Sequence, residues 1–289
     1  MKLYILGNGF DLAHGLPTKY NDYYDFLVKQ HETWFIRMLE YYFGNDTQHP
    51  HNILWSQLEK ALGIYNVNDI YDYLKEDHTL DEEHVSQYVG EVEAEVQYHF
   101  VDICYKFNVT FSDWYQSIDL AGATRQKNFS FVNDDLFLTF NYSDTLEKVY
   151  GLDEMQVLHI HGRASKGDEL IVGHNNPATM PNGIEDDFLD NTANICAIVE
   201  TINKLVKNTG RIISENQIFF ANLADVDEVE VYGHSIEDVD MPYFEKVKQS
   251  VDSKANWKFS YHKEIEVDHK NDIAKQFGID AGHYMLFKV

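Results

Sequence analysis

The chain begins with a short apolar run that ends at once in glycines. Residues 2–6 read Lys-Leu-Tyr-Ile-Leu, which is typical of a buried strand, and residues 7–9 read Gly-Asn-Gly. A short helical stretch follows, and it ends near Gly15 because Leu16 precedes a proline and is pushed into extended geometry. A strand, a glycine turn and a helix in this order predict the first unit of an α/β domain. In such a unit the turn amides and the helix dipole can hold a phosphate.

The glycine turn departs from the standard dinucleotide fingerprint. The third glycine of that pattern would fall at position 12, which is Leu12. Gly7 and Gly9 therefore have two interpretations. They bind a nucleotide phosphate, or they form a tight turn that only packing requires.

Strand-like and helical segments alternate in the second half of the chain. Strands are predicted at residues 135–140, 155–160, 169–172, 228–232, 256–262 and 284–289. Helices are predicted near residue 21 and at residues 145–150, 185–222, 242–251 and 271–277. Strands that alternate with helices favour a parallel or mixed sheet.

Residues 27–128 interrupt this alternation with helical periodicity. Apolar side chains recur at helical spacing in residues 55–62, 85–92 and 96–111. We interpret residues 55–62 as core packing, with Glu59 either at a rim or close to a cleft. The chain has no internal repeat and no Pro/Gly-rich linker. We therefore predict a single domain over residues 1–289 with a helical insertion at about 27–128.

The charge of the chain limits its partners. It carries 48 acidic and 23 basic side chains, a formal charge of -25, and the basic residues are scattered. Such a field repels nucleic acid and anionic membranes. The apolar start is too short for a secretory signal, and no stretch can span a bilayer. Cys104 and Cys196 have no metal-like or redox spacing, which fits a reducing compartment. We expect a cytoplasmic protein without direct nucleic acid or membrane contacts.

Polar residues gather directly after the predicted strands. These clusters are Asn8, Asn141 with Asp144, His161, His174 with Asn175, and His234 with Ser235. In an open parallel sheet, ligands bind outside the carboxyl ends of the strands. If the strands are parallel, we expect the five clusters to converge on one cleft.

Two simpler interpretations apply to members of these clusters. Asn141 could cap the helix that follows it, since Asn is a favoured N-cap residue. His159 and His161 lie two residues apart, and together with His174 and His234 they suggest a metal site. No carboxylate or cysteine spacing supports a metal, and histidines at strand ends are more often hydrogen-bonded within a site. We therefore predict no bound metal.

Six motifs follow one another in a specific order. They are GNGFDLAHGLPTKY at 7–20, WSQLE at 55–59, TFNY at 139–142, HIHG at 159–162, GHN at 173–175 and YGHS at 232–235. This set resembles the AbiH family of phage abortive-infection proteins, over residues 7 to about 240. That family in turn resembles the sirtuin-like fold. The resemblance implies a Rossmann-like, mainly parallel sheet with helices on both faces.

The resemblance also implies a dinucleotide site. Residues 7–9 and Pro17 would bind the dinucleotide, and His161 would be the catalytic histidine. Asn141, with either Ser143 or Asp144, would lie beside the nicotinamide ribose. Residues 233–235 would contact phosphate and ribose. Sirtuin deacylases also carry a four-cysteine zinc module, which a chain with two cysteines lacks. The comparison therefore favours defence-type domains that hydrolyse NAD over protein deacylases.

These residue types suit cleavage of the nicotinamide–ribose bond. The reaction builds positive charge on the sugar, as other glycosyl transfers do. A neutral histidine can accept a proton, and an Asn amide can hold a water or the ribose without adding charge. We expect Asn141 and His161 to be the catalytic pair. The expected nucleotide contacts are Gly7, Asn8, Gly9, Phe10, Asp11, Pro17, Asp144, His174, Asn175, Gly233, His234 and Ser235.

The sequence thus predicts a phage-defence protein that binds NAD and hydrolyses it. The alternative is a nucleotide-binding sensor without turnover, which would use its helical insertion to meet a partner. A metal-dependent nuclease is less favoured, because no paired-carboxylate motif stands out. A second copy of the chain and a phage-derived trigger are the further partners considered.

Overall fold

A computed structural model describes residues 1–44, 53–70, 103, 105–181 and 189–289. They form two compact units. The first unit comprises Met1–Lys19, Ser112–Ile171 and Asn208–Val289, and the second comprises Tyr20–Phe111 and Val172–Lys207. The single-domain organisation with an insertion at 27–128 stays a prediction.

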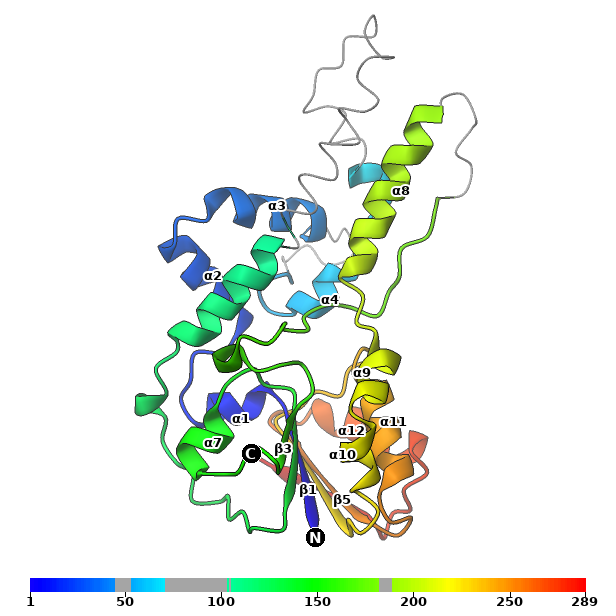
Figure 1. The fold of residues 1–289 in the computed structure, drawn as a ribbon. Coiled ribbons are helices and arrows are strands. Elements are labelled where there is room, and N and C mark those ends of the chain that lie inside the picture. Colours follow the sequence, from blue (N-terminus) through cyan, green and yellow to red (C-terminus); the bar gives the residue numbers. More distant parts are fainter. Residues whose placement is uncertain (45–52, 71–102, 104, 182–188) are drawn as a thin grey trace, which may run out of the picture. The chain divides into compact units, whose positions relative to one another are not determined.

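The first unit is built on a six-stranded parallel sheet (Figure 1). Its strands are β1 (Lys2–Leu6), β2 (Leu136–Thr139), β3 (Val157–His159), β4 (Glu228–Tyr232), β5 (Asn256–Tyr261) and β6 (Tyr284–Lys288). They lie in the order β3-β2-β1-β4-β5-β6, and every neighbouring pair is parallel. The order reverses between β1 and β4, which is the switch point of a Rossmann-like sheet. The predicted Rossmann-like α/β class is confirmed.

Helices cover both faces of this sheet (Figure 1). They are α1 (Asn8–Ala13), α7 (Thr145–Tyr150), α9 (Thr209–Glu215), α10 (Gln217–Ala221), α11 (Met241–Ser250) and α12 (Glu266–Gln276), with short 3-10 turns at η2 (Leu120–Gly122) and η3 (Ala164–Lys166). Successive side chains of a strand point to opposite faces. Leu3 and Ile5 accordingly pack in the core under α9 to α12, whereas Tyr4 and Leu6 pack with α1 and α7.

The second unit is helical in its described part. It contains α2 (Tyr20–Lys29), α3 (Thr33–Phe43), α4 (Leu58–Leu62) and α8 (Leu189–Lys204), and residues 67–70 and 105–111 are also helical. Tyr23 is fully buried, and its ring centroid lies 5.2 Å from that of Phe111 and 6.3 Å from that of Trp55. Trp55, Leu58 and Leu62 are buried, so the core interpretation of residues 55–62 is confirmed. The helical periodicity at 85–92 and at 96–102 lies outside the described residues.

The strand predicted at residues 169–172 is wrong. This segment has no regular secondary structure, and its backbone bonds to loops instead of a neighbouring strand. Ile171 N–H donates to the His161 carbonyl (2.9 Å), and the Tyr142 hydroxyl donates to the Ile171 carbonyl (2.9 Å). Leu170 and Val172 are buried. The apolar pattern of residues 169–172 therefore reflects burial of the side chains, and the backbone does not pair with a strand of the sheet. No helix in the described ranges is both long and apolar enough to cross a bilayer.

Candidate functional site

The β1–α1 turn packs tightly against the end of β4. Gly7 N–H donates to the Tyr232 carbonyl (3.0 Å), and Gly9 N–H donates to the Gly233 carbonyl (2.9 Å). A Cβ atom on Gly9 would lie 2.6 Å from the Gly233 Cα, so the approach of the two backbones requires glycine. The packing interpretation of these glycines thus has a geometric basis. Their phosphate-binding role stays a prediction.

The other residues of the turn are held by the protein itself. The Asn8 amide donates to the Thr18 carbonyl (2.7 Å), and the buried Phe10 ring packs on Phe129 with centroids 5.0 Å apart. Pro17 is exposed. Asn8 and Phe10 thus have a bonding and a packing role within the protein. The nucleotide contacts predicted for Asn8, Phe10 and Pro17 stay predictions.

Asp11 is fully buried and links α1 to the start of α7. Its carboxylate accepts hydrogen bonds from the hydroxyls of Ser143 (2.6 Å) and Thr145 (2.7 Å). Burial raises the pKa of Asp11, and the two hydroxyl donors act in the opposite direction. Both of these hydrogen bonds thus come from residues that follow β2, within the protein.

Asn141 connects the end of β2 to the β1–α1 turn. Its side-chain amide donates to the Gly7 carbonyl (3.1 Å), and its own carbonyl lies 3.2 Å from His159 Nδ1. The N-cap residue of α7 is Asp144. The alternative in which Asn141 caps this helix is therefore wrong.

Asp144 forms a buried ion pair with Arg163. Its Oδ1 accepts from Arg163 Nε (2.5 Å) and from the Ser165 hydroxyl (2.7 Å), and Arg163 Nη1 also donates to Glu154 (3.0 Å). Mutual pairing offsets the cost of removing these charges from water. The network fixes the loop after β2 onto the loop after β3, which carries His161.

Asn141 and His161 leave the sheet side by side. The register pairs Thr139 of β2 with His159 of β3, and each predicted catalytic residue lies two positions beyond its strand's paired residue. Ile160 N–H still donates to the Thr139 carbonyl (3.1 Å). The two predicted catalytic residues thus emerge from adjacent strands, one strand removed from the switch point.

Two histidines meet a carboxylate that sequence reasoning missed. His161 Nε2 lies 3.7 Å from Asp240 Oδ1, and His234 Nε2 lies 3.5 Å from Asp240 Oδ2. The three residues are 2%, 6% and 8% exposed, for His161, Asp240 and His234 in turn. Asp240 precedes Met241-Pro242 at the start of a predicted helix. At such a position an Asp is interpreted as a helix cap, so no sequence signal indicated its contact with the histidines.

The loop after β4 holds a strained conformation. Gly233 has φ 64° and Ile236 has φ 63°, and a positive φ is a genuine outlier for a β-branched residue. Ser260 Oγ accepts from Gly233 N–H (2.8 Å), and His234 Nδ1 accepts from Ile236 N–H (2.9 Å). Strain of this kind persists only where surrounding contacts impose it.

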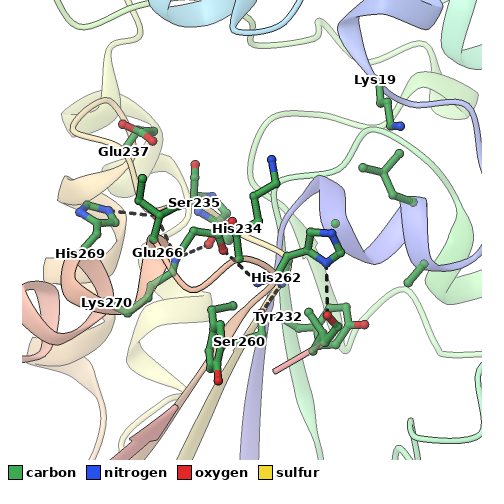
Figure 2. Close-up of a pocket in the computed structure, with 18 residues that line it drawn as sticks. Lys19, Tyr232, His234, Ser235, Glu237, Ser260, His262, Glu266, His269 and Lys270 are labelled. Carbon is green, nitrogen blue, oxygen red and sulfur yellow. Dashed lines mark hydrogen bonds between the residues drawn. The ribbon is translucent and has the colours of Figure 1, made fainter. Parts of the chain in front are cut away.

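Lys270 of α12 supplies such contacts (Figure 2). Its buried ammonium donates to the carbonyls of His234 (2.5 Å) and Ser235 (2.8 Å), and His269 Nε2 lies 3.2 Å from the Ser235 and Ile236 carbonyls. Burial lowers the pKa of Lys270 to about 8, partly opposed by Glu266 and Glu237. Sequence reasoning missed Lys270, because a lysine in a helix is usually solvated.

An open cavity of about 950 Å³ lies beside this loop (Figure 2). It is bounded by α1, by the ends of β4 and β5, and by the first turns of α12. Four predicted contact residues line it: Gly9, Gly233, His234 and Ser235. Lys19, His262 and Lys263 also line it, together with Glu237 and Glu266. A lining of mixed charge that also contains apolar side chains, such as Leu12 and Ile265, suits a polar organic ligand of nucleotide size.

His174 and Asn175 belong to the second unit. His174 is buried, its Nδ1 accepts from Asn176 N–H (3.2 Å), and burial lowers its pKa to about 4. Asn175 is exposed. In the same unit Glu59 pairs with the buried Lys207 at 2.8 Å. The nucleotide contacts expected of His174 and Asn175 stay predictions.

The chain matches the family model described as bacteriophage abortive infection AbiH over residues 3–261. No curated protein and no solved structure shows a match. In the part of the chain that the structure describes, no three His, Cys, Asp or Glu side chains form a group that could hold a metal ion. The match spans β1 to β5 and every strand-end motif of the first unit. The chain therefore belongs to the bacteriophage abortive infection AbiH family.

Proposed function

We propose that this protein acts in abortive phage infection by binding NAD at the carboxyl edge of the sheet and hydrolysing its nicotinamide–ribose bond. Membership of the AbiH family supports the defence role. The observation that carries the chemical part is the exit of Asn141 and His161 from adjacent strands, one strand away from the strand-order reversal.

The choice of a dinucleotide rests on the positions of two features. The cavity lies beside β4 and β5, and the Asn141–His161 pair lies beyond β2 and β3. Strand β1, which leads into the β1–α1 turn, lies between β2 and β4 and so separates the two features. A ligand with two nucleoside halves joined by a pyrophosphate would span both sides, as ligands do at the switch point of such sheets.

The proposed reaction uses neutral groups to manage a developing cation. The C1′–N bond breaks with its electron pair moving to the pyridinium nitrogen, so nicotinamide leaves uncharged. Water attacks C1′ and gives its proton to the His161 ring, which yields ADP-ribose. Asn141 holds the water or the ribose. General base catalysis of this kind contributes roughly 10²–10⁴ in rate.

Nicotinamide release from NAD by the purified protein tests the proposal. We expect Asn141→Ala to abolish release and His161→Ala to reduce it at least 100-fold, a loss on the order of the base contribution. His283→Ala, which lies in the turn before β6, is the control. Circular dichroism and a melting curve must show that each variant folds. Full activity in both folded variants would exclude this catalytic pair.

A protein that is inactive until phage infection triggers it would show no activity when purified, so a second experiment is done in cells. NAD and nicotinamide should be measured in cells that carry the protein, before and after phage infection. We expect infection to deplete NAD in cells with the wild-type protein and not in cells with the His161→Ala variant. NAD that stays constant through a productive defence response would contradict the hydrolysis proposal.

One observation favours the alternative of a nucleotide sensor without turnover. Asn141 and His161 are 5% and 2% exposed, and the Asn141 amide already donates to Gly7. A binding-only protein needs no water at these side chains. Calorimetry with NAD and ADP-ribose separates the two functions: micromolar binding of NAD with no product in a triggered sample favours the sensor.

A further inference from the structure

We infer that Asp240 is a positioning residue that orients His161 and stabilises its protonated ring, through a carboxylate shared with His234. This inference rests on the proposed hydrolysis, in which His161 is the base. Nucleophile or base activation in enzymes commonly depends on a third group that orients the base.

The two histidines and the carboxylate come from three separate parts of the fold. His161 follows β3, His234 follows β4, and Asp240 immediately precedes α11. Each Asp240 oxygen faces one ring: Oδ1 lies 3.7 Å from His161 Nε2, and Oδ2 lies 3.5 Å from His234 Nε2. Because all three residues are more than nine-tenths buried, the charge of Asp240 is poorly screened by solvent.

The hydrogen bonds of His234 determine which nitrogen carries its proton. Ile236 N–H donates to His234 Nδ1 (2.9 Å), so this nitrogen is an acceptor. A neutral His234 ring therefore carries its proton on Nε2, facing Asp240 Oδ2. Asp240 Oδ2 thus lies nearest the protonated Nε2 of His234, and Asp240 Oδ1 lies nearest Nε2 of His161.

The same carboxylate selects the reactive nitrogen of His161. A proton on Nε2 of His161 faces Asp240, which leaves Nδ1 as the nitrogen that accepts a proton from the attacking water. When Nδ1 is protonated, the positive ring lies beside a buried negative charge. Opposite charges within about 4–6 Å favour the charged form of a titratable group.

Aromatic rings surround the two histidines. The Phe140 centroid lies 5.1 Å from that of His161 and 4.2 Å from that of His234, and the Tyr243 centroid lies 5.6 Å from that of His161. Among the described residues, further titratable groups close to the cluster are Tyr142 from the loop after β2, Tyr243 from α11, and Lys270 from α12 at the His234 carbonyl. Low polarity around the rings strengthens the interaction with Asp240.

The first test removes the charge and keeps the shape. We expect Asp240→Asn to lower kcat for nicotinamide release about 100-fold with KM changed less than about threefold, because the residue acts through the base and not on the substrate. Asp240→Glu should recover part of kcat, since it restores the carboxylate. Asp238→Asn removes an exposed carboxylate from the same loop and should leave kcat unchanged. A kcat in Asp240→Asn equal to that of Asp238→Asn would overturn the inference.

The second test needs no activity. Proteins with ¹⁵N-labelled histidine should show, by ring-nitrogen NMR, a neutral His161 with its proton on Nε2. In Asp240→Asn the titration midpoint of His161 should fall by about 1 pH unit or more, and in Asp238→Asn it should not move. A neutral His161 with its proton on Nδ1 in the wild-type protein overturns the inference, even if Asp240→Asn fails to fold. Loss of the proposed function would appear differently, as an absence of nicotinamide release with the NMR result intact.

Discussion

Gly9 and Gly233 face each other across the switch point of the sheet, with no room for a side chain on either. Gly9 N–H donates to the Gly233 carbonyl at 2.9 Å, and a Cβ atom on Gly233 would lie 2.6 Å from Gly9 C and from Phe10 N. The contact joins the turn after β1 to the loop after β4. Two of the predicted nucleotide-contact segments are thereby fixed relative to each other.

Gly233→Ala should be strongly destabilising. Gly233 also has φ 64°, so alanine would meet both a left-handed backbone and a steric clash. We expect a loss of about 2–4 kcal/mol in the free energy of unfolding, measured by urea denaturation. Gly167 is the matched control, because it has φ 71° with open space around it. Gly167→Ala should cost only about 1–2 kcal/mol. Equal losses in both variants would show that the backbone contact adds nothing.

Lys270→Met should remove a pH dependence at alkaline pH. Burial lowers the pKa of Lys270 from 10.5 to about 8. Between these values the unfolded chain binds a proton that the folded protein has released, so the contribution of Lys270 to stability rises with pH. Below about pH 8 both states carry the proton, and the cost of burying the charge is fully present.

The measurement is the difference in free energy of unfolding between wild-type and Lys270→Met proteins from pH 7 to 10.5. The difference cancels the titration of tyrosines, which both proteins share. We expect the free energy of unfolding of the wild type to increase relative to that of Lys270→Met as pH rises. A difference that is flat across this range would mean that Lys270 stays charged when it donates to the His234 and Ser235 carbonyls.

The sheet could be predicted because its strands carry local signals. Residues 228–232 and the helix at 145–150 occur with the predicted bounds, since an apolar run or a helical period stops at a glycine or a turn residue. Residues 169–172 carry the same apolar signal without a strand. Burial against loops and burial in a sheet produce the same sequence pattern, so periodicity cannot separate them.

The site could be predicted only where it follows the strands. Asn141, His161 and His234 stand directly after β2, β3 and β4, and parallel topology places those ends on one edge. Asp240 reaches the same region from the N-cap position of α11, and Lys270 reaches it from within α12. Their positions depend on how each helix packs on the sheet, and no local pattern encodes that. Phe10 and Asp11 belong to the predicted motif, yet both are buried. A position in the motif therefore does not by itself place a side chain in a binding site.

His174→Gln should make the protein less sensitive to acid. Burial lowers the pKa of His174 from 6.5 to about 4. Between these values the unfolded chain binds a proton that the folded protein does not, so stability is lost as pH falls through this window. Glutamine does not titrate. We expect urea midpoints of the variant to change less than those of the wild type between pH 7 and 4.5. Exposed His262→Gln should behave as the wild type, and the same acid loss in His174→Gln would contradict the assignment.

Ala13→Trp should block the cavity without disturbing the core. Ala13 is the exposed last residue of α1, and it lines the space of about 950 Å³ between α1 and α12. A bound ligand stabilises the folded protein by about 2.7 kcal/mol at 100 times its Kd, so NAD should raise the melting temperature of the wild type. The indole would occupy the volume that the ligand needs, and we expect no such rise in Ala13→Trp. Ala221→Trp places the same side chain on the exposed end of α10, away from the cavity-lining residues, and should keep the full NAD shift. If Ala13→Trp retains that shift, NAD binds elsewhere, and the cavity beside β4 and β5 is not the nucleotide site.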